Sequence, residues 1–332
     1  MKVLGVESSC DETSASVLID GEIVSNTIYS QKIHNKFGGV VPEFASREHE
    51  ARIIAVITDA LNSANVKLNE LDGFAVCYGP GLMGALLVGL NTVKGLSIVS
   101  QKKFIGVNHL EGHLYAGFID NKSVKFPFLN LLVSGGHTQL WQINAIGKYT
   151  LLGTTVDDAA GEAFDKGARM LGLGYPGGPE IQREGLKGNR KKFNFPRPII
   201  RSSPLNFSFS GLKTALFYTL KKMNESQIKN NRSDLAASYQ EAIIDSLISR
   251  IKLAIKKYGI TDVVVSGGVA ANKRFREKLI QIDKINHHFP PIEYCTDNGA
   301  MIALAGYALL KSGNTSQLDL KPIPNLGLHS AD

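Results

Sequence analysis

The sequence predicts an α/β protein in which one pattern of strands and turns occurs twice. The repeated elements are apolar strands over 2–7, 13–20 and 22–29 in the first half and over 127–133, 138–144 and 148–152 in the second. A polar turn joins the first two strands of each half, at 8–12 and at 134–137. Each half later has another strand that runs through a glycine turn into a helix, at 73–82 and at 262–269. We therefore expect two β-rich lobes with alternating helices, facing each other across a cleft.

The length of 332 residues is enough for two domains, and the repeat divides them. We expect an N-terminal lobe over 1–125 and a C-terminal lobe over 126–332, the latter with a helical, basic insertion over about 176–258. The apolar run 82–99 is interrupted by Asn91 and Lys94, which favours a buried helix over a membrane span. Neither glycine turn matches GxGxxG or a Walker loop, so a Rossmann or P-loop fold is poorly supported.

The composition limits the partners and the compartment. The net charge of +7 points to a polyanionic partner, nucleic acid before membrane, or simply to solubility. The three cysteines, Cys10, Cys77 and Cys295, are too widely spaced for a disulfide framework or a CxxC site, and a reducing cytosol fits them. The first strand is too short to be a signal peptide. We expect a cytoplasmic protein without membrane contact.

Two histidines, His109 and His113, form the most informative pair in the chain. On a helix, this i, i+4 spacing places both imidazoles on one face, where they can bind one metal ion. The alternative is that the two side chains only pack or cap locally. Asp297 is the best candidate for a third ligand, although an Asp before an apolar helix commonly serves as its N-cap. Two imidazoles and one carboxylate suit iron, zinc or manganese and leave positions open for a substrate.

Glycine-rich turns at the ends of strands are candidates for binding phosphate. Such turns expose backbone N–H groups at close range. Ser134-Gly135-Gly136 and Gly267-Gly268 are the turns that we expect to bind a phosphate or an adenylate. The alternative is a tight hairpin that needs glycine for a positive φ.

A run of basic residues with interleaved aromatic side chains is the candidate for nucleic-acid binding. Only the acid Glu184 falls within it, and the aromatic residues are Phe193 and Phe195. The basic residues are Arg183, Lys187, Arg190, Lys191, Lys192, Arg197 and Arg201. Phosphate contacts and base stacking suit this composition, whereas the alternative is a solvated loop.

Eight motifs follow one another along the chain and together carry a family resemblance. They are Gly5-Val6-Glu7-Ser8-Ser9-Cys10-Asp11-Glu12-Thr13, the segment from His109 to His113, Leu132-Val133-Ser134-Gly135-Gly136-His137-Thr138, Asp157-Asp158-Ala159-Ala160-Gly161-Glu162-Ala163-Phe164-Asp165-Lys166, Tyr175-Pro176-Gly177-Gly178-Pro179, Phe207-Ser208-Phe209-Ser210-Gly211-Leu212-Lys213, Gly267-Gly268-Val269-Ala270-Ala271-Asn272 and Cys295-Thr296-Asp297-Asn298-Gly299-Ala300. In type and order they resemble the bacterial tRNA threonylcarbamoyladenosine transferase family (TsaD), over nearly the whole chain.

The resemblance implies an actin-like ATPase fold, shared with sugar kinases and heat-shock chaperone ATPases, in two lobes around a central cleft. It also implies a reaction. A threonylcarbamoyl group passes from threonylcarbamoyl-adenylate to the exocyclic amine of an adenosine in tRNAs that read codons beginning with A. That adenosine is the one on the 3′ side of the anticodon.

Carried over residue by residue, the resemblance implies a site. His109, His113 and Asp297 match the metal ligands, with iron as the expected ion and zinc as the alternative. Asp11 falls where the family points to a catalytic role, and Glu12 is the second carboxylate that we nominate; the alternative for both is turn and cap chemistry. The positions that hold ATP or the adenylate in the cleft are matched by Leu132, Val133, Ser134, Gly135, Gly136, Asp165, Gly178 and Asn272.

Two other functions stay open at this point. A zinc metalloprotease would need the HExxH order, whereas Leu110 follows His109 and Glu111 stands two positions on. A non-catalytic actin-like ATPase module would have no need for a set of two histidines and one aspartate. The resemblance implies tRNA as the substrate and a heteromeric complex with a paralogous actin-like subunit and a small P-loop ATPase. A separate synthase would supply the adenylate.

Overall fold

The chain folds into two α/β units, each built around one five-stranded mixed sheet, in a computed structural model that describes residues 1–119, 123–145 and 147–328. The strand order is β3-β2-β1-β4-β5 in the first sheet and β10-β9-β6-β7-β8 in the second. In both sheets the first strand of the repeat pairs antiparallel with the next strand and parallel with the later one. The predicted duplication of one α/β pattern is therefore confirmed.

The first unit contains residues 1–119 together with the C-terminal segment from Thr296. Its elements are β1 (Lys2–Glu7), β2 (Glu12–Ile19), β3 (Glu22–Ser30), α1 (Pro42–Ser63), β4 (Gly73–Gly79), α2 (Met83–Ser100), β5 (Lys103–Asn108), α3 (His109–Ala116) and α9 (Gly299–Lys311), with short 3-10 turns at Lys32–Lys36 and Leu68–Glu70.

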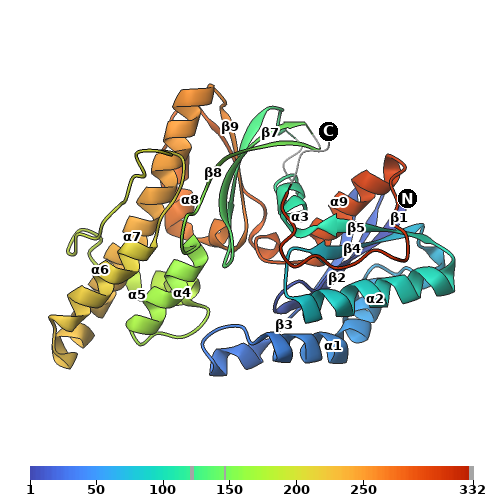
Figure 1. Ribbon diagram of the computed structural model, residues 1–332, viewed down its shortest axis with the longest axis horizontal. Coiled ribbons are helices and arrows are strands. Elements are labelled where there is room, and N and C mark those ends of the chain that lie inside the picture. Colours follow the sequence, from blue (N-terminus) through green and yellow to red (C-terminus); the bar gives the residue numbers. More distant parts are fainter. Residues whose placement is uncertain (120–122, 146, 329–332) are drawn as a thin grey trace. The chain divides into compact units, whose positions relative to one another are not determined.

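The second unit contains the described residues between 123 and Cys295. Its elements are β6 (Phe128–Val133), β7 (Thr138–Ala145), β8 (Lys148–Thr154), α4 (Ala160–Met170), α5 (Gly177–Gly185), α6 (Ser210–Lys221), α7 (Glu225–Tyr258), β9 (Asp262–Ser266), α8 (Lys273–Ile280) and β10 (Asn286–His288), with short 3-10 turns at Gly268–Ala271 and Ile292–Tyr294. Figure 1 labels most of these elements.

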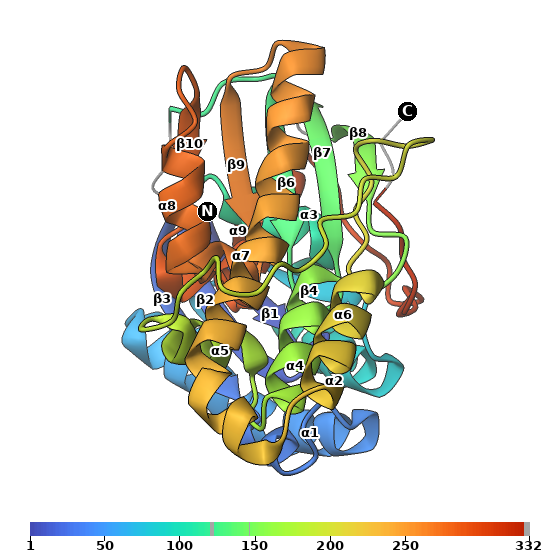
Figure 2. The ribbon, with the colours of Figure 1, turned by 90° about the vertical axis from the view of Figure 1, so that its left-hand side faces the viewer.

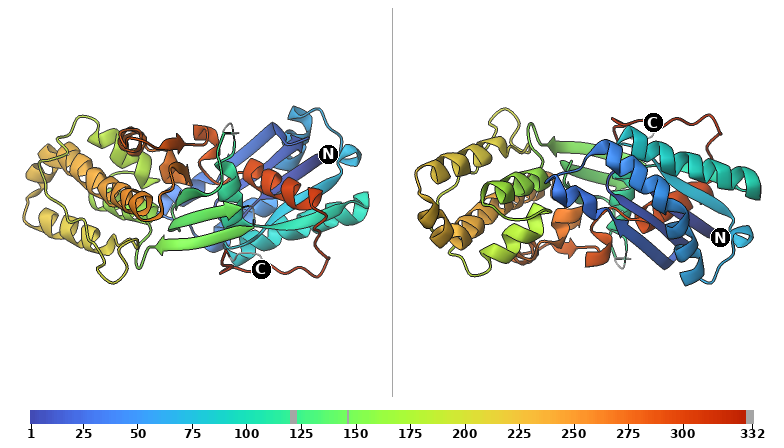
Figure 3. Two further views of the ribbon diagram at one scale, coloured as in Figure 1. Left: turned by 90° about the horizontal axis from the view of Figure 1, so that it is seen from above. Right: turned by 90° about the horizontal axis from the view of Figure 1, so that it is seen from below.

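Helices cover both faces of the first sheet. Successive side chains of a strand point to opposite faces, so Leu4 and Val6 of β1 pack in one core with α1 and α2. Gly5, between them, faces α9, and a Cβ at Gly5 would come within 2.4 Å of the Ala303 backbone nitrogen. Figure 3 shows α9 over the strands from above and α1 with α2 over them from below. The glycine is thus required for α9 to lie directly on the sheet.

The second sheet packs against the long helix α7. Figure 2 shows its strands in the order β10, β9, β6, β7 and β8 from left to right, with α7 running along them. The apolar side of α7 is continuous from Leu235 to Ala254 and shares a core with Leu129, Leu131 and Val133 of β6. Asn224 is the N-cap of this helix, and Gly259, in the αL conformation, is its C-cap. Asparagine and glycine are residue types that are favoured at these two positions.

The expected division into 1–125 and 126–332 differs from the observed units in the C-terminal segment. Residues 296–328 belong to the first unit, because the apolar helix α9 packs on β1, β2, β4 and α3. Local periodicity predicts such a helix but not the sheet against which it packs. Residues 329–332 of the expected C-terminal lobe lie outside the described residues.

The apolar run 82–99 forms α2, which is buried on one face only. Ala85, Leu86, Gly89, Leu90 and Val93 are buried against β4 and α1. By contrast, Ile98 and Val99 are 59% and 81% exposed. The expectation of a buried helix is therefore correct only for the side of α2 that faces β4 and α1. The helix is long and apolar enough to cross a membrane by length and composition alone, but it is a covering layer of the first sheet.

Candidate active site: a metal centre and two kinds of turn

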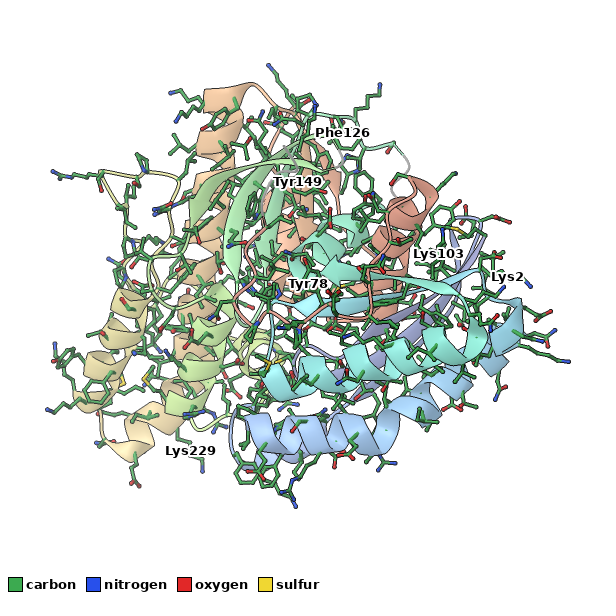
Figure 4. All side chains as sticks on the ribbon, turned by 45° about the vertical axis from the view of Figure 1, so that its right-hand side comes forward. Lys2, Tyr78, Lys103, Phe126, Tyr149 and Lys229 are labelled. Carbon is green, nitrogen blue, oxygen red and sulfur yellow. The ribbon has the colours of Figure 1, made fainter. Side chains whose placement is uncertain are left out.

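Three parallel strands of the first unit end side by side and bring their C-terminal residues together. β1 pairs with β4 and β4 with β5, all in the same direction. Figure 4 labels Lys2 and Lys103, the first residues of β1 and β5, at one end of this sheet and Tyr78 of β4 at the other. Glu7 ends β1, His109 directly follows β5, and Cys77 lies two residues before the end of β4. The carboxyl edge of a parallel sheet is where α/β proteins place their sites.

His109, His113 and Asp297 converge at this edge. Both histidines lie on α3, as predicted, and their rings meet edge to face with centroids 4.7 Å apart. The Nε2 atoms of His109 and His113 lie 3.6 and 3.1 Å from Oδ1 of Asp297. Atoms bound at about 2.1 Å around one ion lie about 3.0–3.4 Å apart. The three side chains therefore have the spacing of ligands to a single ion.

Asp297 is not the N-cap of α9, although its position in the sequence suggested that role. The N-cap of α9 is the next residue, Asn298, whose Oδ1 accepts a hydrogen bond from the Met301 N–H at 3.1 Å. Asn298 is fully buried, whereas the Asp297 side chain is 19% exposed. The structure thus gives the two adjacent side chains separate tasks, and the carboxylate faces the histidines.

Glu7 fixes the orientation of His109 from the other side of the ring. The Nδ1 atom of His109 lies 3.2 Å from Oε2 of Glu7 and 3.1 Å from Oγ of Ser9. Burial alone would lower the pKa of His109, but the Asp297 and Glu7 carboxylates outweigh it and hold the pKa well above its ordinary value. Our sequence analysis did not assign Glu7. The sequence shows only that a carboxylate ends an apolar strand, whereas the complete burial that marks this carboxylate as functional is visible only in the structure.

Cys77 is a neutral neighbour of this pair. Its sulfur lies within 4.8 Å of ligand atoms of Glu7 and His109. Burial, with a smaller effect of the Glu7 charge, raises the pKa of the Cys77 thiol to about 12. Without a metal ion, the Cys77 side chain is therefore a neutral thiol at neutral pH, beside His109 and Glu7.

The predicted catalytic carboxylates, Asp11 and Glu12, lie in a turn of the same unit. We call residues 9–12, which join β1 to β2, the acidic turn. Burial, followed by the charges of Asp11 and Asp297, raises the pKa of Glu12 well above its ordinary value. Burial and the same carboxylates also raise the pKa of Cys10. The acidic turn is therefore close enough to Asp297 for their charges to repel each other.

The glycine turn 134–136 lies at the carboxyl end of β6 in the second unit. Gly135 and Gly136 do not have a positive φ, and a Cβ on either would meet no atom within 4 Å. The alternative of a hairpin that needs glycine for its conformation is therefore wrong for this turn. Helix α4 begins beneath it, with the Gly161 N–H donating to the Ser134 carbonyl at 3.2 Å. Open space above backbone groups is what an approaching phosphate requires.

The other glycine turn, at Gly267-Gly268, divides its roles. Gly267 has a φ of +88°, and a Cβ there would come within 2.4 Å of the Val133 carbonyl oxygen. The backbone conformation at 267 therefore requires a glycine, which is the alternative to phosphate binding that the sequence left open. Gly268 and Gly178 face open space, like Gly135. Gly178 is in the first turn of α5, and its neighbour Gly177 donates an N–H to Oδ1 of Asp165 at 2.7 Å.

Three of the residues expected to hold the adenylate have structural tasks of their own. Leu132 and Val133 are completely buried in β6, so their side chains support the turn instead of reaching a ligand. Asn272 caps α8 by accepting from the Phe275 N–H at 3.0 Å, and its Nδ2 donates to Gln240 at 2.8 Å. Among the residues expected to hold the adenylate, the backbone of 134–136 and Gly178 are the positions that face open space.

The basic run is partly neutralised by neighbouring acids. Arg183 pairs with Glu180, Lys192 with Asp234 and Arg197 with Asp245. In the part of the chain that the structure describes, no ion pair involves the other exposed members of the run, which are Lys187, Arg190, Lys191 and Arg201.

The aromatic residues of the basic run do not form a stacking surface. Phe195 is 3% exposed and packs edge-on against Tyr239, with centroids 5.7 Å apart, and Phe193 packs against the same core. The predicted stacking role is therefore wrong for Phe195. Exposed aromatic side chains occur instead on α6, where Phe217 and Tyr218 are each more than half exposed.

Solved structures identify the fold. The chain is similar to HypF of T. kodakarensis, with a TM-score of 0.62, 13% identity and coverage of 93% of this chain and 47% of that chain. It is also similar to component A of the (R)-2-hydroxyglutaryl-CoA dehydratase of Acidaminococcus fermentans, with a TM-score of 0.56, 17% identity and coverage of 95% and 100%. These likenesses show the fold alone. They confirm the duplicated actin-like ATPase fold that the sequence predicted.

Relatives in sequence identify the family. A protein of Thermosipho melanesiensis named tRNA N6-adenosine threonylcarbamoyltransferase is 51% identical over 332 residues, which cover 99% of this chain and 100% of the relative. The family described as TsaD, tRNA N6-adenosine threonylcarbamoyltransferase, matches residues 22–304. With most of its length matched, the chain belongs to the TsaD family of transferases that modify tRNA.

Proposed function

We propose that this transferase moves a threonylcarbamoyl group from threonylcarbamoyl-adenylate to the exocyclic amine of the adenosine on the 3′ side of the anticodon. The observation that carries the proposal is the convergence of two imidazoles and a carboxylate beside the acidic turn. The relatives' names give the acceptor amine and the tRNA, whereas the adenylate donor and the position in the tRNA are part of the proposal.

A divalent cation fits the three converging side chains. His113 is completely buried. Its Nδ1 has no hydrogen-bond partner among the described residues, and its Nε2 faces Oδ1 of Asp297 at 3.1 Å without the geometry of a hydrogen bond. Orphaned buried nitrogens are costly unless something binds them. The carboxylates around them also leave negative charge that a cation would neutralise. We infer that His109, His113 and Asp297 hold iron or zinc, which would act as a Lewis acid on the phosphate and carbonyl oxygens.

The acidic turn supplies groups for proton transfer. An exocyclic adenine amine is a poor nucleophile and must lose a proton as it attacks the carbamoyl carbon, so a positioned base is needed. We assign this role to Asp11. Glu12, whose pKa is raised, keeps its proton to higher pH than an ordinary glutamate. It is therefore suited to donate a hydrogen bond rather than to accept a proton.

The open turns of the second unit are suited to hold the adenylate. The turn 134–136 leaves its backbone unobstructed, and α4 and α5 begin nearby with positive N-terminal dipoles. Gly178 and Gly268 offer the same open approach. Asp165, which orders the start of α5, would act through the Gly177 backbone.

We further propose that the protein works in the cytoplasm as part of a heteromeric complex. The companions would be a paralogous actin-like subunit, a small P-loop ATPase and a separate synthase that supplies the adenylate. The exposed apolar side of α2 supports a protein partner, since Met83, Leu87, Ile98 and Val99 are all at least 40% exposed.

The catalytic assignment is tested by Asp11→Asn. Loss of a general base lowers the rate by about 10²-fold or more. We expect such a loss in single-turnover formation of N6-threonylcarbamoyladenosine, measured by mass spectrometry of nucleosides after incubation with the companion proteins, threonylcarbamoyl-adenylate and tRNA. The matched control is Asp59→Asn on the exposed side of α1, which should keep the wild-type rate. A wild-type rate in Asp11→Asn would remove Asp11 from the mechanism.

The metal site should stabilise the protein in a pH-dependent manner. Because the pKa of His109 is raised, its protonated ring stabilises the metal-free fold fully below about pH 6.5. This stabilisation is lost as the pH rises through the raised pKa. A bound cation replaces the proton, so the rise in Tm on adding Zn²⁺ should be larger at pH 8 than at pH 6. Asp297→Ala should abolish the rise without unfolding the protein, since Asn298 is the N-cap of α9. Equal rises at both pH values would place the ion elsewhere.

The turn 134–136 is tested by Gly135→Val. Gly135 does not have a positive φ, and a Cβ there would meet no atom within 4 Å, so the variant should fold with wild-type Tm. Its branched side chain would occupy the space through which a phosphate reaches the backbone. We expect at least tenfold weaker adenylate binding by calorimetry, with unchanged metal content. Gly211→Val, at another exposed glycine of the second unit, is the control. Normal binding by Gly135→Val would make the turn merely structural.

Electrostatic contacts with tRNA should depend on salt concentration, whereas stacking contacts should not. Replacing Lys187, Arg190 and Lys191 with Ala should weaken binding and reduce the slope of log K against log salt by about 0.7–0.9 per lost phosphate contact. Replacing Phe217 and Tyr218 with Ala should weaken binding by about 1–3 kcal/mol per stacked base and leave the slope unchanged. Filter binding over a salt series gives both values. An unchanged slope in the first variant would move the phosphate contacts to another surface.

A further inference from the structure

We propose that His49 is a positioning residue for the reaction, which holds the acidic turn in place from beneath. The inference rests on the proposed role of Asp11 and Glu12 and adds to it the group that fixes their backbone. His49 lies on α1 and is completely buried. It touches neither His109, His113 nor Asp297 in any described contact.

Both ring nitrogens of His49 are committed to the turn and the strand that follows. Nε2 lies 2.9 Å from the carbonyl oxygen of Cys10. A carbonyl can only accept, so Nε2 carries the proton. Nδ1 then accepts from the hydroxyl of Thr13, at 2.7 Å. The contacts determine one neutral tautomer, and they tie α1 to residues on both sides of Asp11 and Glu12.

A second buried histidine orders the neighbouring peptide. The Val41 N–H donates to Nδ1 of His34, so the Nε2 proton of His34 donates to Oε1 of Gln31, at 2.8 Å. The Gln31 side-chain amide donates to the Ala45 carbonyl, and its backbone N–H donates to the Asp11 carbonyl at 3.1 Å. The carbonyls of Cys10 and Asp11 are thus both held by groups of the segment from Gln31 to His49.

The remaining contacts complete the restraint. The Ser9 N–H donates to Oε1 of Glu7 at 2.5 Å, and the Leu82 N–H donates to the Ser9 carbonyl at 2.8 Å. Of these restraints on the turn, the hydrogen bond to the Cys10 carbonyl comes from the His49 side chain. A substitution of His49 can therefore remove this hydrogen bond without removing any backbone hydrogen bond between β1 and β2.

Such a restraint is needed because the turn carries like charges. Burial, followed by the charges of Asp11 and Asp297, raises the pKa of Glu12, so these carboxylates repel one another and favour movement of the turn away from Asp297. A neutral donor resists that movement without adding a positive charge that would compete with a cation. Burial lowers the pKa of His49, in keeping with a neutral ring. Lys or Arg at this position would not meet the same requirement.

The test compares His49→Leu with His49→Gln in the full chain with its companion proteins. Leu keeps the volume and removes both hydrogen bonds, whereas the Gln amide retains a donor near the position of Nε2. Displacing reacting groups by about 1 Å costs up to about 10²-fold in rate. We expect kcat to fall 10- to 100-fold in His49→Leu, with KM for tRNA and metal content within about twofold of wild type. His49→Gln should recover most of kcat.

Three controls separate positioning from general stability. His288→Leu removes another buried, hydrogen-bonded histidine, in the second unit, and should leave kcat unchanged. In an Asp11→Asn background, His49→Leu should add less than about a threefold loss, because the group that it positions is already disabled. Thr13→Val deletes only the hydroxyl that donates to Nδ1 and should lower kcat about fivefold. It provides the same test if His49→Leu does not fold.

Wild-type kcat in both His49→Leu and Thr13→Val would overturn the proposal. So would a loss that His49→Gln does not restore, or one that is equally large with and without Asp11→Asn. The rate of Asp11→Asn alone decides the proposed role of Asp11, so the two failures are distinguishable.

Discussion

The buried imidazole of His109, held between Glu7 and Asp297, joins the parts of the first unit that lie furthest apart in the sequence. Glu7 ends β1, His109 follows β5 and Asp297 precedes α9. Each carboxylate contacts a different ring nitrogen, so the orientation of the imidazole depends on both. Asp297 can reach it only if α9 lies directly on β1. Close packing at Gly5 and Gly299, where a Cβ would collide with backbone atoms, permits that approach.

This dependence explains which parts of the structure follow from sequence patterns. The strands, the helix with its two histidines and the open turn at Gly135 each depend on local periodicity or local chemistry, and each is predicted. The partner of α9 is not, because an apolar helix has no preference in its own sequence for one sheet over another. For this reason the sequence assigns residues 296–328 to the C-terminal lobe, whereas in the structure they belong to the first unit.

The candidate site shows the same division between local and tertiary information. The spacing of His109 and His113 predicts two ligands for a metal ion. Asp297 is the candidate for the third ligand from its residue type and position, and the family resemblance implies the same residue. Glu7, His49 and Gln31 act through buried hydrogen bonds to residues distant along the chain, and no period in the sequence marks them. Phe195 shows the opposite error, since an aromatic side chain in a basic run fits a nucleic-acid surface and a hydrophobic core equally well. The burial of Phe195 in the structure decides in favour of the hydrophobic core.

The two units place different chemistry at equivalent positions of one repeat. β1 corresponds to β6 in sheet order, and the turn that follows each strand leads into an antiparallel neighbour. After β1 that turn carries carboxylates, whereas after β6 it carries Gly135 and Gly136 with open backbone. Carboxylates attract cations and protons, and exposed N–H groups near helix N-termini attract anions. A duplicated scaffold thus offers a place for a metal and acid–base chemistry in one unit and for a phosphate in the other.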